Sequence, residues 1–158
     1  GPLRLGPSEM PAMKKTSHAH CQAPAGAGLV PCDLAWFDRF NACQYYEAHE
    51  VLEVLWLRTS GRDRDFFKGL IQVAGAFVHL RKQLERPHHA TDSTRLRPAA
   101  RLFLRGKSHL APYGPVHLRL DVAAVCALCE SLAHGIEQSG FADNPWNPAT
   151  PPHIRPAP

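Results

Sequence analysis

A long run of helically spaced apolar residues constrains the fold more than any other feature of the chain. Between Arg64 and Glu85, apolar side chains recur every three or four residues and share one side: Phe67, Leu70, Ile71, Ala74, Phe77 and Val78. This spacing matches the 3.6-residue turn of an α-helix and differs from the two-residue alternation of a strand. Pro87 follows, and helices usually end before the residue that precedes a proline. We therefore predict one long helix over residues 64–85.

Four further segments have helical patterns, and none has the alternation of a strand. These segments are residues 34–40, 44–58, 94–105 and 122–138. Asp33 and Asp121 are predicted to cap the first and the last of them, because an aspartate before a helix can accept a hydrogen bond from its first turn. A connector is predicted from Gly106 to Leu120. The sequence therefore predicts an all-α fold, a compact bundle of about five helices.

The two ends of the chain differ from its middle. The first 31 residues are rich in Gly, Pro, Ala and Ser without any apolar period, and the end of the chain is rich in Pro. Hydrophobic residues make up 44% of the chain and charged residues 20%, which suits one globular core. We predict a disordered leader at residues 1–31, a single helical domain at 32–140 and a Pro-rich extended tail at 141–158.

Charge and cysteine content limit the kinds of partner. The formal net charge is +4, but the basic residues are scattered among carboxylates, which disfavours nucleic acid. Arg97, Arg101 and Arg105 repeat every four residues, and we interpret them as a solvated helix face. No apolar run approaches the ~20 residues of a membrane span. Five cysteines at irregular spacing do not indicate a disulfide framework, so a cytoplasmic location without membrane attachment is predicted.

The candidate site is a polar cluster on the second predicted helix. Helical geometry places His49 and Glu53 on one side, leaves Glu50 at the margin and turns Glu47 away. On the long helix, a second stripe consists of small or polar residues: Lys68, Gln72, Gly75 and His79. If the two stripes face each other, His49, Glu53 and His79 form a candidate metal set beside Gln72. We expect close helix packing at Gly75, because glycine destabilises a helix interior by ~1 kcal/mol relative to alanine.

Two interpretations of this cluster remain open. Histidine and carboxylate ligands suit zinc, manganese or iron, and a metal-bound water with Glu50 as general base would give a metal-dependent hydrolase. A small polar ligand is the other form of the binding hypothesis. Alternatively, the cluster is a hydrogen-bonded structural network inside a helical interaction or scaffold module, because buried polar groups must be paired. The pair Cys126 and Cys129 is interpreted as core packing.

Two motifs resemble one known family. The stretch Glu47-Ala48-His49-Glu50-Val51-Leu52-Glu53 with Trp56, followed by residues 64–74 and His79, is similar to the domain of unknown function 309. The resemblance implies a compact helical bundle whose first two helices are similar to a tetratricopeptide hairpin. It implies no established activity. The family pattern often has glycine where Cys43 stands, so we expect a less extreme turn there.

The resemblance also singles out residues by their motif positions. These positions are Glu47, His49, Glu50, Glu53, Trp56, Arg64, Gln72 and His79. Together with the polar stripe, they give a second candidate set, one for contacts to a ligand rather than to a metal. The residues of this ligand set are Glu47, Trp56, Arg64, Lys68 and Gln72.

Overall fold

The computed structural model describes residues 31–158, and the predicted leader, except for its last residue Pro31, lies outside the described residues. Five α-helices follow one another: α1 (Pro31–Asn41), α2 (Tyr45–Arg58), α3 (Arg64–Glu85), α4 (Leu96–Leu110) and α5 (Val122–Gln138). Short 3₁₀ turns, η1 (Gly61–Asp63), η2 (Asp92–Thr94) and η3 (Ala111–Tyr113), and the paired strands β1 (Val116–His117) and β2 (Leu120–Asp121) connect them. The predicted all-α bundle is confirmed. The likeness of the first two helices to a tetratricopeptide hairpin stays a prediction.

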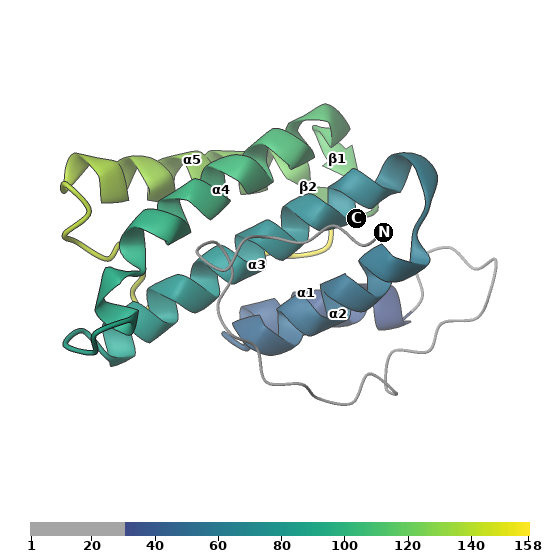
Figure 1. The fold of residues 1–158 in the computed structure, drawn as a ribbon. Coiled ribbons are helices and arrows are strands. Elements are labelled where there is room, and N and C mark those ends of the chain that lie inside the picture. Colours follow the sequence, from purple (N-terminus) through teal and green to yellow (C-terminus); the bar gives the residue numbers. More distant parts are fainter. Residues whose placement is uncertain (1–30) are drawn as a thin grey trace.

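Helix α3 is the centre of the molecule. In Figure 1 it runs between α4 and α5 on one side and α1 and α2 on the other. The ring of Phe77 is fully buried, and its centroid lies 5.1 Å from that of Phe40, 5.0 Å from Tyr45 and 5.1 Å from Phe103. One side chain of α3 therefore joins α1, α2 and α4 in a single aromatic core, as its place in the apolar stripe requires.

Helices α3 and α4 approach each other at two glycines. A Cβ atom on Gly106 would lie 2.8 Å from Val73 Cγ2 and 3.0 Å from the Gly69 carbonyl oxygen. A Cβ atom on Gly69 would lie 2.9 Å from Leu110 Cγ. The predicted connector start at Gly106 was wrong, since α4 continues to Leu110. This glycine provides room for a neighbouring helix instead of ending its own.

The turn after α1 keeps the left-handed conformation that the family's glycine indicates. Cys43 has φ 60°, its backbone N–H donates to Phe40 O at 3.0 Å, and Gln44 N–H donates to Arg39 O at 2.8 Å. These two bonds form the Schellman arrangement that closes a helix and favours glycine at the left-handed position. The expectation of a less extreme turn was therefore wrong. The hydrogen bonds of the helix end fix the backbone whatever the side chain.

We expect Cys43→Gly to stabilise the protein. A residue with a Cβ in the left-handed region is strained by about 1 kcal/mol, and glycine removes that strain. Glycine also makes the unfolded chain more flexible, which offsets part of the gain. Urea denaturation should show an increase of about 0.5–1 kcal/mol in the free energy of unfolding. A decrease would contradict the assignment of strain to this turn.

The two predicted aspartate caps have different outcomes. Asp121 Oδ1 accepts a hydrogen bond from Ala124 N–H at 3.0 Å, so it caps α5 as predicted. Asp33 lies inside α1, which begins at Pro31, and the cap predicted there was wrong. Proline suits the first turn of a helix because its missing N–H has no partner there and its φ is already helical.

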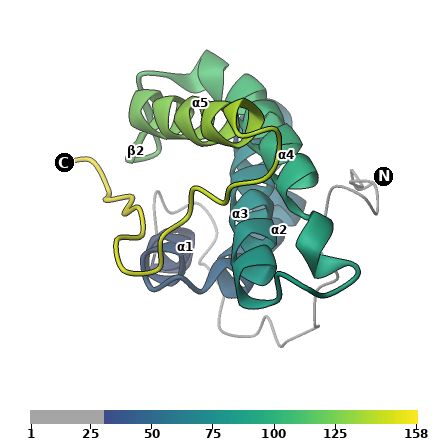
Figure 2. The same cartoon turned by 90° about the vertical axis from the view of Figure 1, so that its left-hand side faces the viewer.

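The last eighteen residues pack along the bundle. This segment, predicted to be a Pro-rich extended tail, has no helix or strand and runs back past α1 (Figure 2). Trp146 and Ile154 are buried in the core. Asn41 holds Ile154 through two hydrogen bonds, from Asn41 Nδ2 to Ile154 O at 2.8 Å and from Ile154 N–H to Asn41 Oδ1 at 2.7 Å. The segment thus closes the side of the bundle between α1 and α5.

Within residues 31–158, no helix has both the length and the apolar character needed to cross a membrane.

Candidate functional site

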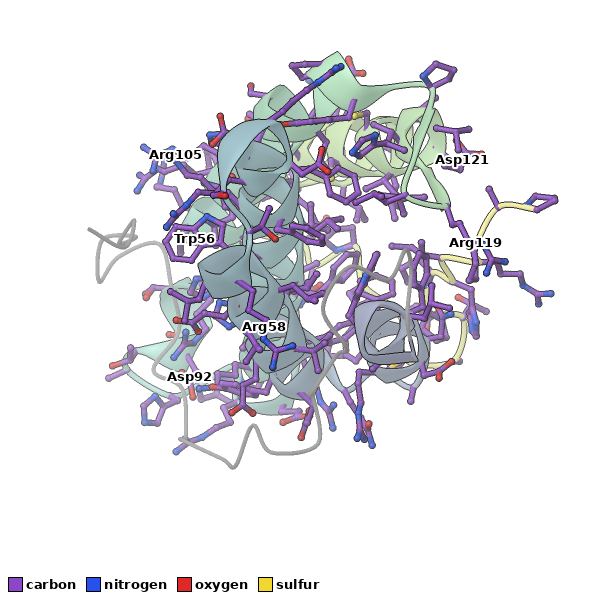
Figure 3. All side chains as sticks on the ribbon, turned by 90° about the vertical axis from the view of Figure 1, so that its right-hand side faces the viewer. Trp56, Arg58, Asp92, Arg105, Arg119 and Asp121 are labelled. Carbon is purple, nitrogen blue, oxygen red and sulfur yellow. The ribbon has the colours of Figure 1, made fainter. Side chains whose placement is uncertain are left out.

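The second stripe of α3 lies between α2 and α4, and we call its residues Lys68, Gln72, Gly75 and His79 the polar strip. Contacts on either side define its surroundings. The Lys82 ammonium lies over the Tyr46 ring of α2, and the Arg64 guanidinium lies over the Trp56 ring. Helices α2 and α3 therefore run antiparallel, which puts His49 at a level between Gln72 and His79. On the other side, His109 of α4 hydrogen-bonds to Gln72, and Arg95, the residue before α4, hydrogen-bonds to His79. Figure 3 shows Trp56, Arg105 and Asp92 along this side of the molecule, with Arg119 and Asp121 on the other.

His49 is a buried side chain whose polar atoms lack partners. It is 4% exposed, and within the described part of the chain neither ring nitrogen has a hydrogen-bond partner. The nearest carboxylate oxygen is Glu53 Oε2, 3.9 Å from Nδ1, on a side chain that is half exposed. Burial lowers the pKa of His49 from 6.5 to about 4. The ring is therefore neutral at pH 7, with one N–H donor and one acceptor nitrogen available.

Gln72 and His109 form a bridge between α3 and α4. His109 Nδ1 lies 2.8 Å from Gln72 Oε1 and 3.0 Å from the Arg105 carbonyl oxygen. Both of these oxygens accept hydrogen bonds, so Nδ1 must carry the proton. His109 is a site residue that the sequence analysis missed, because the helix was expected to end before it. Its spacing of four residues from Arg105 was the available signal.

His79 belongs to a second cluster at the far end of the strip. Arg95 Nη1 donates to His79 Nδ1 at 3.0 Å. Burial and the charges of Arg95 and Lys82 lower the pKa of His79 to about 3, against a small opposing effect of Asp92. The bond from Arg95 requires an unprotonated Nδ1, so the neutral ring carries its proton on Nε2.

Asp92 anchors this second cluster. Its Oδ1 lies 2.6 Å from both Arg95 Nε and Nη2, and its Oδ2 lies 3.3 Å from Arg86 Nη1. Burial pulls the pKa of Asp92 upward, but the hydrogen bond and charges of Arg95, with those of His89 and Arg86, outweigh it and lower the pKa. Neither Asp92 nor Arg95 was predicted, because both lie outside the motifs and the contact spans sixteen residues.

The predicted metal set of His49, Glu53 and His79 stays unconfirmed. Across residues 31–158, no group of three or more His, Cys, Asp or Glu side chains could hold a metal ion. A metal on His79 Nε2 would require the proton on Nδ1, yet Arg95 donates to that nitrogen. A neighbouring guanidinium also opposes a second cation. The remaining members, His49 and Glu53, form a pair without a third ligand.

The predicted ligand residues divide into two places. Trp56 is buried, and Arg64 lies over its ring at 4.4 Å from the centroid, next to Lys68 and Gln72 on α3. Glu47 is exposed and lines a separate cavity of about 260 Å³ at the other end of α2. That cavity is lined by Tyr45, Tyr46, Glu47, Val78, Arg81, Lys82 and Glu85. Glu50, the candidate base, is buried.

His49 makes stability depend on pH. Its pKa is about 4 in the folded protein and near 6.5 when unfolded, so only the unfolded chain takes up a proton as the pH falls below 6.5. The resulting stability is complete above pH 6.5 and is lost as the pH falls toward 4. Between pH 7.5 and pH 5, we expect His49 to account for a loss of about 2 kcal/mol.

Urea denaturation at the two pH values, for the wild type and for His49→Leu, measures this loss. The variant should lose about 2 kcal/mol less than the wild type. An equal loss in both proteins would mean that His49 titrates normally.

Fold and site together define a small all-α protein with a polar strip on its central helix, enclosed by the two neighbouring helices. Residues 35–89 match the family model described as Domain of unknown function (DUF309). The matched segment contains α2, α3 and most of α1, and it includes every residue that the motif resemblance singled out. The family resemblance of the sequence is thus confirmed over residues 35–89. Neither a curated protein nor a solved structure matches the chain.

Proposed function

We propose that the protein binds a small polar ligand at the polar strip, with His49 as the central hydrogen-bonding group. The observation that carries this proposal is the burial of His49 without a hydrogen-bond partner among the described residues. A buried polar group without a partner destabilises a protein by about 1–3 kcal/mol, so native structures contain few of them. A ligand that bonds to the ring would offset this loss.

The other buried polar residues of the strip support a distinct role for His49. Gln72 is held by His109, and His79 is held by Arg95. These contacts fix α4 against α3 and fit the structural interpretation of the cluster. His49 lies between them in level and takes part in neither bond, so the structural interpretation accounts for its neighbours and leaves His49 unexplained.

The test is a comparison of ligand response and stability in His49→Leu. Leucine has a similar volume and no polar atoms, so we expect it to raise the free energy of unfolding at pH 7.5 by about 1 kcal/mol. The same variant should lose the ligand response. A residue that weakens the fold and is needed for binding marks a functional site.

The response is measured by NMR of the histidine ring nitrogens during titration with a library of small polar fragments. His134→Leu is the matched control, because His134 is exposed on α5. Binding should move the His49 resonances in the wild type and in the control variant. If no fragment moves them, and if His49→Leu destabilises the fold instead, the protein is the structural scaffold module and the binding proposal fails.

A divalent metal is the second candidate, favoured by the i, i+4 spacing of His49 and Glu53 and their distance of 3.9 Å. Two protein ligands leave positions for water, and Glu50 would then serve as the base of a hydrolase. Zinc, manganese and iron are the metals to test, by metal analysis of untagged protein and by thermal shift. No bound metal and no shift would remove this candidate.

The cytoplasmic location, which suits the free thiols of Cys43, Cys126 and Cys129, is part of the same proposal.

A further inference from the structure

We infer that the ligand of the polar strip carries an oxyanion group, a phosphate or a carboxylate, bound by Arg64 and Lys68. This inference rests on the proposed function and adds the chemical class of the ligand. Its starting point is a contrast among the cations of the molecule. Four cations of α3, α4 and the turn between them, Arg81, Arg86, Arg95 and Lys107, have a carboxylate partner, whereas these two do not.

The paired cations are distributed along the helices. Arg81 lies 2.7 Å from Glu85, and Lys107 lies 3.1 Å from Glu130. Arg95 and Arg86 share Asp92 at 2.6 Å and 3.3 Å. Within the described residues, no ion pair joins Arg64 or Lys68 to a carboxylate, although both side chains are half-buried. Half-buried cations are less well hydrated than exposed ones, and an oxyanion would compensate their charge.

Arg64 is held in place for such a contact. Its guanidinium lies over the buried ring of Trp56, which fixes the side chain while leaving its N–H donors at the edge of the plane. A guanidinium fork binds phosphate and carboxylate oxygens in pairs. Lys68 follows one helical turn later, at a rise of about 6 Å, so both cations can reach one anionic group.

Two carboxylates near this end of the strip, Asp63 and Glu53, have contacts of their own. Asp63 accepts a hydrogen bond from His117 Nε2 at 2.9 Å, which directs it toward β1. Glu53 is half exposed on α2, and its Oε2 lies 3.9 Å from Nδ1 of the neutral His49 ring. A small molecule with an anionic group at Arg64 and Lys68 and a polar group near His49 fits this distribution. Two half-buried cations between helices suit a small molecule better than the many spaced phosphates of a nucleic acid.

The experiment titrates the full chain with sodium pyrophosphate and with sodium malonate, each against sodium chloride at equal ionic strength. Arginine Nε and lysine side-chain NMR signals report the anion, and the histidine ring signals report His49. The two salts distinguish a phosphate from a carboxylate. A neutral polar fragment that moves His49 while neither anion binds would overturn the oxyanion class and leave the proposed function standing.

Variants identify the residues that bind the anion. Lys68→Gln and Arg64→Gln should each weaken anion binding by about tenfold, as loss of a charge-assisted bond implies. Arg155→Gln, which removes an exposed cation from the C-terminal segment, should leave binding unchanged. If Arg64→Gln does not fold, Arg64→Lys is the test: it keeps the charge and loses the guanidinium fork, so it should also weaken anion binding.

Two results would overturn the inference. One is equal anion affinity in Lys68→Gln, Arg155→Gln and the wild type, which would indicate general attraction to a basic protein. The other is tighter binding of a single-stranded 20-nucleotide DNA than of pyrophosphate, with a steep dependence on salt, which would indicate a nucleic-acid surface. If the anions bind through Lys68 and Arg64 while His49 does not respond, the oxyanion contact stands and the central role of His49 fails.

Discussion

Gly106→Val will lower the free energy of unfolding by about 3 kcal/mol, because α3 and α4 have no room for a side chain where they cross. The first added atom would lie 2.8 Å from Val73 Cγ2 and 3.0 Å from the Gly69 carbonyl oxygen. Backbone cannot move aside as a flexible side chain can, and Val73 is itself buried. Valine and glycine are both poor helix formers, so helix propensity offsets little of this loss.

Gly135→Ala is the matched control for that variant. Gly135 also lies inside a helix, α5, but a Cβ atom there meets nothing closer than Pro145 Cβ at 4.0 Å. Alanine should therefore raise the free energy of unfolding by about 0.5–1 kcal/mol, the gain in helix propensity. Urea denaturation of both variants gives the comparison. A Gly106→Val protein as stable as the wild type would mean that α3 and α4 do not cross at these glycines.

Gly106→Val also tests how the crossing of α3 and α4 affects the polar strip. His109 lies one residue before Leu110, which contacts Gly69, and its bond to Gln72 depends on the position of α4. Moving α4 outward should lengthen that bond and alter the His109 ring signals before the protein unfolds. Gly69 and Gly106 thus set the distance between α3 and α4 beside the polar strip. Their role is in the packing of two helices and not in the conformation of either helix.

Features encoded in neighbouring residues could be predicted from the sequence. Helix α3 was predicted with the bounds that it has, and α5 likewise, because their ends are marked by a proline, a glycine and an aspartate cap within a few residues. The polar stripe of α3 followed from the same periodicity. Each of these signals needs only the geometry of a single helix.

Features that depend on a partner far along the chain could not be predicted in the same way. Glycine at position 106 is typical of a helix end. Its actual role, close packing against Gly69 of α3 within a continuing helix, depends on a residue far away in the sequence. Gln72 hydrogen-bonds to His109, thirty-seven residues away, whereas the helical spacing indicated His49 as its neighbour. The Pro-rich segment gives no period at all, yet Trp146 joins the core.

Trp146→Ala will lower the free energy of unfolding by about 4 kcal/mol, the loss expected for a large buried aromatic side chain. Trp146 is 7% exposed, and its Nε1–H donates to the Tyr45 hydroxyl at 3.1 Å. Tyr45 in turn stacks on Phe77 with ring centroids 5.0 Å apart. Removing the indole opens a cavity beside this aromatic core and leaves the buried Tyr45 hydroxyl without that donor.

Two further variants separate the packing of Trp146 from a general effect of the C-terminal segment. Trp146→Phe keeps an aromatic ring and loses the N–H, so it should lower the free energy of unfolding by only about 1–2 kcal/mol. Thr150→Ala changes an exposed residue of the same segment and should have an effect within about 0.5 kcal/mol. Circular dichroism during urea denaturation measures all three. If Trp146→Ala unfolds at the wild-type midpoint, the segment does not hold its place against α1 and α3 in solution, and the bundle must be stable without it.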